Sequence, residues 1–201
     1  MIQRGAMVCL VRHADAGDKR VWRGADGDRP LSDQGRREAA GLVIRLEDFP
    51  IDRVLSSPAL RCTQTVGPVA ARNRLPVEQS DLLRIDADVA ALAAWIRGRT
   101  SGHTILCTHG ELLADLLRVL VANGGIMTDA LLWPKGSTWI LQQTDDGPLR
   151  GRFLPPLEWP VVQNPMRDGF WRPSSGARSP GRRPQPRHTS RSEGLEEREA
   201  T

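Results

Sequence analysis

Short runs with apolar centres alternate with longer stretches of helical periodicity along most of the chain. The runs lie at 7–11, 52–57 and 103–108, and apolar runs of this length are typical of strands buried in a parallel sheet. Between and after them, apolar residues recur with the spacing of one helical face, which predicts helices over 32–46, 58–69, 89–96 and 111–120. This alternation predicts an α/β fold whose parallel strands are joined by crossover helices.

Capping and turn residues indicate where these elements begin and end. Ser32 is suited to a helix N-cap, and Pro58 is expected in the first turn of its helix, where proline is tolerated. Pro68 falls inside the same helix and removes a hydrogen bond at a cost of about 3 kcal/mol, so we expect a kink there. Further on, 137–144 and 149–153 are predicted to form a hairpin around an Asp-Asp-Gly-Pro turn.

The periodic pattern ends near residue 160. Residues 171–191 contain four prolines, six arginines and four serines, a composition that cannot bury enough apolar surface to fold. We therefore expect one domain over 1–160 and a disordered, Arg/Pro/Ser-rich tail over 161–201. The tail has eight arginines and five acidic residues, and so holds most of the formal net charge of +4. Nucleic acid is therefore expected to bind only weakly, non-specifically and in a salt-sensitive way.

Composition excludes several other classes of protein. The three cysteines, Cys9, Cys62 and Cys107, form no CxxC pair, so we expect neither a zinc site nor a disulfide framework. Residues 1–6 lack the apolar segment of a signal peptide, and Met7 could be the natural start. No apolar run is long enough to span a membrane. We expect a cytoplasmic protein with no membrane partner.

Polar side chains follow each of the three predicted strands. Arg12 and His13 come directly after the first, Ser56 and Ser57 end the second with Arg61 one helical turn later, and His109 follows the third. The carboxyl ends of neighbouring parallel strands meet in one crevice, so these side chains should lie together. An arginine fork binds phosphate oxygens, and a neutral imidazole can act as a nucleophile toward phosphorus. The arrangement indicates a phosphoryl-transfer site.

Four motifs in order resemble the histidine phosphatase superfamily, also called phosphoglycerate mutase-like. They are VRHAD at 11–15, RPLSDQG at 29–35, SSPALRCTQT at 56–65 and CTHGE at 107–111. The resemblance covers roughly residues 7–155 and implies a three-layer α/β/α sandwich with a mostly parallel central sheet. Ala14, where many members have glycine, resembles the small bacterial SixA-type branch and the phosphatase halves fused to nudix hydrolases.

The resemblance also implies roles for the residues at the strand ends. His13 would be the nucleophile that becomes a phosphohistidine, and Arg12, Arg61 and His109 would hold the phosphoryl oxygens. Neither a metal nor another cofactor is expected, because the arginines neutralise the charge. The expected activity is that of a phosphatase acting on a phosphohistidine protein or on a phosphorylated small molecule, either a nucleotide or another phosphoanhydride.

The general acid and the substrate contacts are less defined. Asp86 is a candidate acid, although an aspartate at 86 or 88 could instead cap the helix that begins near Val89, and Asp15 and Glu111 are also close in sequence to the histidines. The candidate substrate loop contains four residues that either contact further phosphates and a base or are simply solvated: Lys19, Arg20, Trp22 and Arg23. A mutase and a catalytically silent phosphate-binding module remain alternatives.

Overall fold

The structure is a computed structural model that describes residues 5–122, 124, 131–144 and 147–157. Its centre is a six-stranded sheet in the order β3-β2-β4-β1-β5-β6. The strands β1 to β4 pair in parallel, whereas β5 pairs antiparallel with both β1 and β6. The strands are β1 (Met7–Arg12), β2 (Arg53–Ser56), β3 (Val77–Gln79), β4 (His103–Thr108), β5 (Thr138–Thr144) and β6 (Gly147–Leu154).

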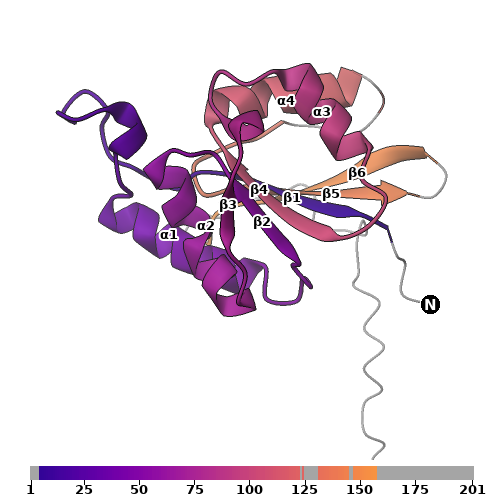
Figure 1. Cartoon of the computed structure of the whole chain (residues 1–201), viewed down its shortest axis with the longest axis horizontal. Helices are drawn as coiled ribbons and strands as arrows, with labels where there is room; N and C mark the ends of the chain where they lie inside the picture. Colours follow the sequence, from indigo (N-terminus) through magenta and orange to yellow (C-terminus); the bar gives the residue numbers. More distant parts are fainter. Residues whose placement is uncertain (1–4, 123, 125–130, 145–146, 158–201) are drawn as a thin grey trace, which may run out of the picture. The chain divides into compact units, whose positions relative to one another are not determined.

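Helices cover both faces of the sheet (Figure 1). One face carries α1 (Asp33–Arg45) and α2 (Leu60–Asn73), and the other carries α3 (Val89–Arg97) and α4 (Gly110–Ala122). Two short 3-10 turns, η1 (Asp26–Asp28) and η2 (Asp81–Leu83), lie in the loops after β1 and β3. The predicted α/β/α sandwich with a mostly parallel sheet is confirmed.

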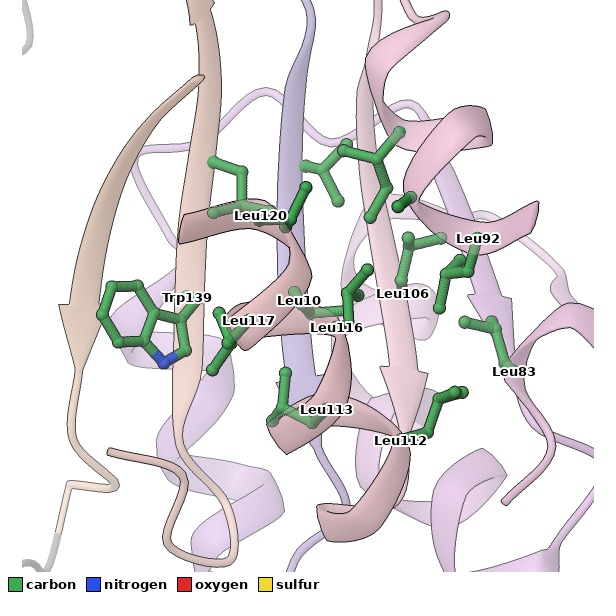
Figure 2. Packing of buried hydrophobic residues seen from close by; sticks show 14 of the residues in the cluster. Leu10, Leu83, Leu92, Leu106, Leu112, Leu113, Leu116, Leu117, Leu120 and Trp139 are labelled. Carbon is green, nitrogen blue, oxygen red and sulfur yellow. The ribbon is translucent and has the colours of Figure 1, made fainter. Parts of the chain in front are cut away.

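The face under α3 and α4 is filled mainly by leucines (Figure 2). Leu10 of β1 and Leu106 of β4 are buried against leucines of both helices. Burying each such side chain contributes roughly 1.5–3 kcal/mol, so this cluster is a main source of stability. The buried Trp139 of β5 keeps its polar atom satisfied, because its indole N–H donates to the Leu132 carbonyl at 2.8 Å.

Most element boundaries agree with the sequence, and one does not. Ser32 caps α1 as predicted, accepting a hydrogen bond from the Gly35 N–H at 3.1 Å. The prediction that Pro58 lies in the first turn of α2 is wrong, since the helix begins at Leu60 with Ala59 as N-cap. The Ser57 hydroxyl accepts from the Ala59 N–H at 3.4 Å, so the chain completes a turn before the helix starts.

Further predictions concern Pro68 and the end of the domain. The helix α2 continues past Pro68 to Asn73, so proline does not end it, and the kink stays a prediction. The predicted hairpin is confirmed as β5 and β6. Two residues of its turn, at 145 and 146, and the whole predicted tail over 161–201 lie outside the described residues. No helix within the described part is long and apolar enough to cross a membrane.

Candidate active site

His13 lies at the carboxyl end of β1, in the centre of the candidate site. Its backbone N–H donates to the Thr108 carbonyl at 2.9 Å, and its carbonyl accepts from the Gly136 N–H at 3.2 Å. The ring is 7% exposed, and Nδ1 is 2.8 Å from the Ala14 carbonyl, which can only accept a hydrogen bond. The proton therefore belongs on Nδ1, and Nε2 keeps the lone pair that a nucleophile needs.

The surroundings of His13 keep its imidazole neutral. Burial is the largest effect and lowers its pKa; the hydrogen bond to Ala14 opposes this, while electrostatic interactions with Arg61, His109 and Arg12 lower it further. The resulting pKa is about 3. At neutral pH the imidazole is therefore uncharged and able to attack phosphorus.

His109 follows β4 and lies edge-on to His13, with ring centroids 5.5 Å apart. Its Nδ1 lies 3.2 Å from Nη2 of Arg61, and its Nε2 lies 2.8 Å from the Ser57 hydroxyl. Because a guanidinium can only donate, Nδ1 must be the acceptor, which leaves the proton of the neutral ring on Nε2 to donate to Ser57. The side chains that follow β1, β2 and β4 therefore lie together, as the order of the strands in the sequence predicts.

Two arginines complete this cluster of side chains. Arg12 donates from Nη1 to the Trp133 carbonyl at 2.7 Å, and Arg61, 4% exposed, donates from Nη1 to the Asp26 carbonyl at 2.6 Å. The Nε atoms of both arginines are buried and have no hydrogen-bond partner within the described residues. Burial lowers the pKa of Arg12, an effect that the charge of Glu111 opposes. The site thus combines a neutral imidazole with the buried guanidinium of Arg61 and the half-buried guanidinium of Arg12.

Close backbone approaches explain two motif glycines. A Cβ at Gly110 would come within 2.7 Å of Cζ of Arg12, so the first turn of α4 can lie against the guanidinium only without a side chain there. A Cβ at Gly35 would come within 1.9 Å of the Asp15 carbonyl oxygen. Glycine at 35 therefore allows α1 to pack directly against the chain that follows His13.

Several residues support the site, and three of them were not predicted from the sequence: Glu38, Thr65 and Lys135. Thr65 accepts from the Ala14 N–H at 3.0 Å, and the buried Glu38 accepts from the Asp15 N–H at 2.8 Å. Burial raises the pKa of Asp15, but hydrogen bonds from Lys135, Ser32 and the Gly17 N–H outweigh this and bring it to about 2. Asp15, Ser32 and Thr65 lie inside the motifs quoted above, so the motifs could have identified them as part of the site. Lys135 lies in none of these motifs, so no motif pointed to it.

The predicted substrate loop follows β1 and is exposed. Arg20 is paired with Asp18 at 2.9 Å and its side chain is 89% exposed, while the Trp22 indole N–H donates to the Ala25 carbonyl. Arg23 is exposed, and Lys19 is exposed but close enough for its charge to lower the pKa of Asp26. Within the described residues, these four side chains neither hydrogen-bond nor ion-pair with His13, so their role in binding stays a prediction.

Asp86 lies on an exposed loop and pairs with Arg84 at 3.2 Å. Hydrogen bonds from its own backbone N–H and from Arg84 lower its pKa, so the carboxyl is ionised at neutral pH and holds no proton to donate. The capping role belongs to Asp88, which accepts from the Ala90 N–H at 2.8 Å. Asp86 as general acid therefore remains a prediction without structural support.

The fold and the site together define a phosphoglycerate mutase-like protein. The sequence model described as "Histidine phosphatase superfamily (branch 1)" matches residues 8–87, a stretch that includes Arg12, His13 and Arg61. The chain is therefore similar to the histidine phosphatase superfamily in this stretch of sequence and in its fold.

Individual relatives cover most of the folded part. An 8-oxo-(d)GTP phosphatase from Mycolicibacterium smegmatis is 30% identical over 155 residues, which are 74% of this chain but only 48% of that protein. The chain therefore spans about half the length of this curated relative. A SixA-type structure from Nakamurella multipartitia has a TM-score of 0.60 and 20% identity, covering 76% of this chain and 97% of that one. A SixA-type structure from Agrobacterium tumefaciens has a TM-score of 0.54 and 26% identity, covering 75% and 98%.

Proposed function

We propose that the protein is a phosphatase that uses His13 as its nucleophile and requires no metal ion. One observation carries the proposal: the neutral imidazole of His13 lies edge-on to His109, with ring centroids 5.5 Å apart, and Arg61 donates to His109 at 3.2 Å. Among the described residues, Nε of Arg12 and of Arg61 is also buried without a partner, as is Nε of Arg45 and of Arg99, and phosphoryl oxygens would satisfy the two arginines of the site. The match to the superfamily model over residues 8–87 and a relative named as a phosphatase support the same reaction class.

The reaction would proceed in two steps. In the first, the Nε2 lone pair of His13 attacks phosphorus, the bond to the leaving group breaks, and the leaving group departs with that electron pair. In the second, water attacks the phosphohistidine and loses a proton, the P–N bond breaks, and inorganic phosphate leaves. Arg12 and Arg61 would neutralise the oxygens throughout, which is the main demand that phosphoryl transfer makes on a protein.

His109 would join these arginines only after a change of partner. Both of its ring nitrogens are engaged in the structure, one by Arg61 and the other by Ser57. A contact from His109 to a phosphoryl oxygen would use the Nε2–H, which now donates to Ser57. The serine hydroxyl therefore holds the tautomer that this contact requires until the substrate arrives.

The substrate class would be a phosphohistidine protein or a nucleotide or other phosphoanhydride. These substrates have good leaving groups, so a strong general acid is not needed, in keeping with the ionised state of Asp86. The SixA-type structures favour the first class, and the relative named for 8-oxo-(d)GTP favours the second. For a nucleotide, we propose that Lys19, Arg20 and Arg23 contact further phosphates and that Trp22 stacks on the base.

A substrate panel with a matched pair of histidine variants tests the activity. The panel contains p-nitrophenyl phosphate, nucleotides, sugar phosphates and a phosphohistidine protein, all assayed with a chelator present. His13→Ala should lower kcat by roughly a hundredfold or more on every substrate that the wild type hydrolyses. His103→Ala, at the opposite end of β4 from His109, is the control and should retain activity. Retention of more than about a hundredth of the activity in His13→Ala would contradict the proposal.

A further inference from the structure

Asp26, on the loop after β1, lies directly against Arg61. The Asp26 carbonyl accepts from Nη1 of Arg61 at 2.6 Å, and its carboxylate Oδ2 lies 3.1 Å from Nη2. The terminal amino groups of the guanidinium therefore both bond to one residue, while Nη2 also donates to His109. Of the three guanidinium nitrogens of Arg61, Nε alone is buried without a partner among the described residues.

A second arginine holds Asp26 in place. Nε of Arg29 donates to Oδ1 of Asp26 at 2.9 Å, and Nη1 of Arg29 donates to the Ala16 carbonyl at 2.7 Å. Arg29 is buried, so this part of the loop is anchored rather than solvated. A continuous series of hydrogen bonds runs from the chain after His13 through Arg29 and Asp26 to Arg61 and His109.

We propose that Asp26 is a positioning residue that orients Arg61 so that its Nε–H faces the phosphoryl group. The proposal rests on the phosphatase reaction proposed above. Arg61 has a long side chain, and ordering that side chain costs conformational entropy. When Arg61 is already ordered in the free protein, this cost does not weaken substrate binding. Asp26 and His109 hold the guanidinium from two sides before the substrate arrives, and preorganised charge is what stabilises a phosphoryl-transfer transition state.

The test compares Asp26→Asn with Asp28→Asn. The second variant makes the same charge change in the same 3-10 turn, but among the described residues it is Asp26, not Asp28, that bonds to Arg61. On p-nitrophenyl phosphate, Asp26→Asn should lower kcat about tenfold with a smaller change in KM, and Asp28→Asn should stay within about twofold of the wild type. Orthovanadate, measured by calorimetry, should bind Asp26→Asn about fivefold more weakly. Removing a negative charge alone would tighten anion binding, so weaker binding reports lost orientation.

A double-mutant cycle separates positioning from a general effect on the fold. In an Arg61→Lys background, Asp26→Asn should change vanadate binding by less than about twofold, because its effect passes through the guanidinium. An equal effect in both backgrounds, tighter vanadate binding, or an Asp28→Asn variant as impaired as Asp26→Asn would overturn the proposal. If Asp26→Asn does not fold, Asp26→Ala in the same cycle decides.

The failure of this inference is distinguishable from failure of the proposed function. A wild-type protein that neither hydrolyses any substrate nor binds vanadate contradicts the phosphatase itself. A wild-type protein that does both, yet is indifferent to substitution of Asp26, contradicts only the role of Asp26.

Discussion

The His13 imidazole links the reactivity of the site to the stability of the fold. The folded protein holds the ring neutral with a pKa of about 3, whereas a histidine in an unfolded chain has a pKa of about 6.5. Between these values the unfolded state binds a proton that the folded state does not. Folding stability from this group is therefore present above about pH 6.5 and is lost as the pH falls toward 3.

This linkage predicts a measurable difference in a variant that cannot titrate at position 13. Urea unfolding at pH 7, 5.5 and 4.5 should show the free energy of unfolding of the wild type falling more steeply with acid than that of His13→Gln. The difference in slope should approach about 1.4 kcal/mol per pH unit, the value for one proton. Parallel pH dependences in the two proteins would show that His13 is not held neutral by the fold.

At the residue scale, the sequence was sufficient to predict which side chains meet in the site, where these side chains directly follow a strand. Arg12, His13 and His109 follow apolar runs, and Arg61 lies one turn into the next helix, so topology alone predicts that they meet. Asp26 was not predictable in this way. Its contact with Arg61 depends on the path of an aperiodic loop, and a carboxylate in such a loop is usually solvated.

At the scale of elements, the loop between β1 and α1 has two parts with different environments. The part around Arg29 and Asp26 is anchored to the site, whereas the preceding part, with Arg20 and Trp22, is exposed. This division is typical of a binding loop that a rigid frame presents to a substrate. Under the proposed function, the cations of the exposed part would contact the further phosphates of a larger substrate.

Replacing Arg20 and Arg23 together with alanine tests whether the exposed part binds substrate. For a nucleoside di- or triphosphate, KM should rise roughly tenfold or more, about 1.4 kcal/mol, because contacts to the further phosphates are lost. KM for p-nitrophenyl phosphate should stay almost unchanged, since that substrate has one phosphate. The matched control replaces Arg72 and Arg97, exposed arginines in the last turns of α2 and α3, and should change neither value. Equal effects on both substrates, or no effect on either, would count against a nucleotide as the substrate.

Element boundaries were predictable where a local signal dominates. Ser32 caps α1 as expected because its hydroxyl meets an orphan N–H of the first turn. Pro58 misled the prediction, because proline suits both a first helical turn and the turn before it, and the Ser57 contact selects the latter. A Ser-Pro pair alone therefore does not determine where the helix begins; the side-chain contact of the serine does.

At the scale of the whole molecule, alternation of strands and helices was enough to predict the layers. The four parallel strands and their covering helices follow from the requirement for crossover connections. The position of the hairpin in the sheet could not be predicted from this alternation, because an antiparallel pair can join either edge of a sheet. Here β5 pairs with β1, which brings the segment before it, including Trp133, against Arg12. The domain boundary at 160 and the disordered tail over 161–201 remain predictions.

Trapping the phosphoenzyme tests the central claim most directly. The wild type is mixed with a substrate labelled in its transferable phosphate and quenched within milliseconds, and the protein is analysed for covalent label. The account predicts label that is stable in base and lost in acid, as expected of a P–N bond, located on the peptide containing His13 and absent from His13→Ala. Label that is stable in acid, label at another residue, or turnover with no covalent label at any time would contradict it.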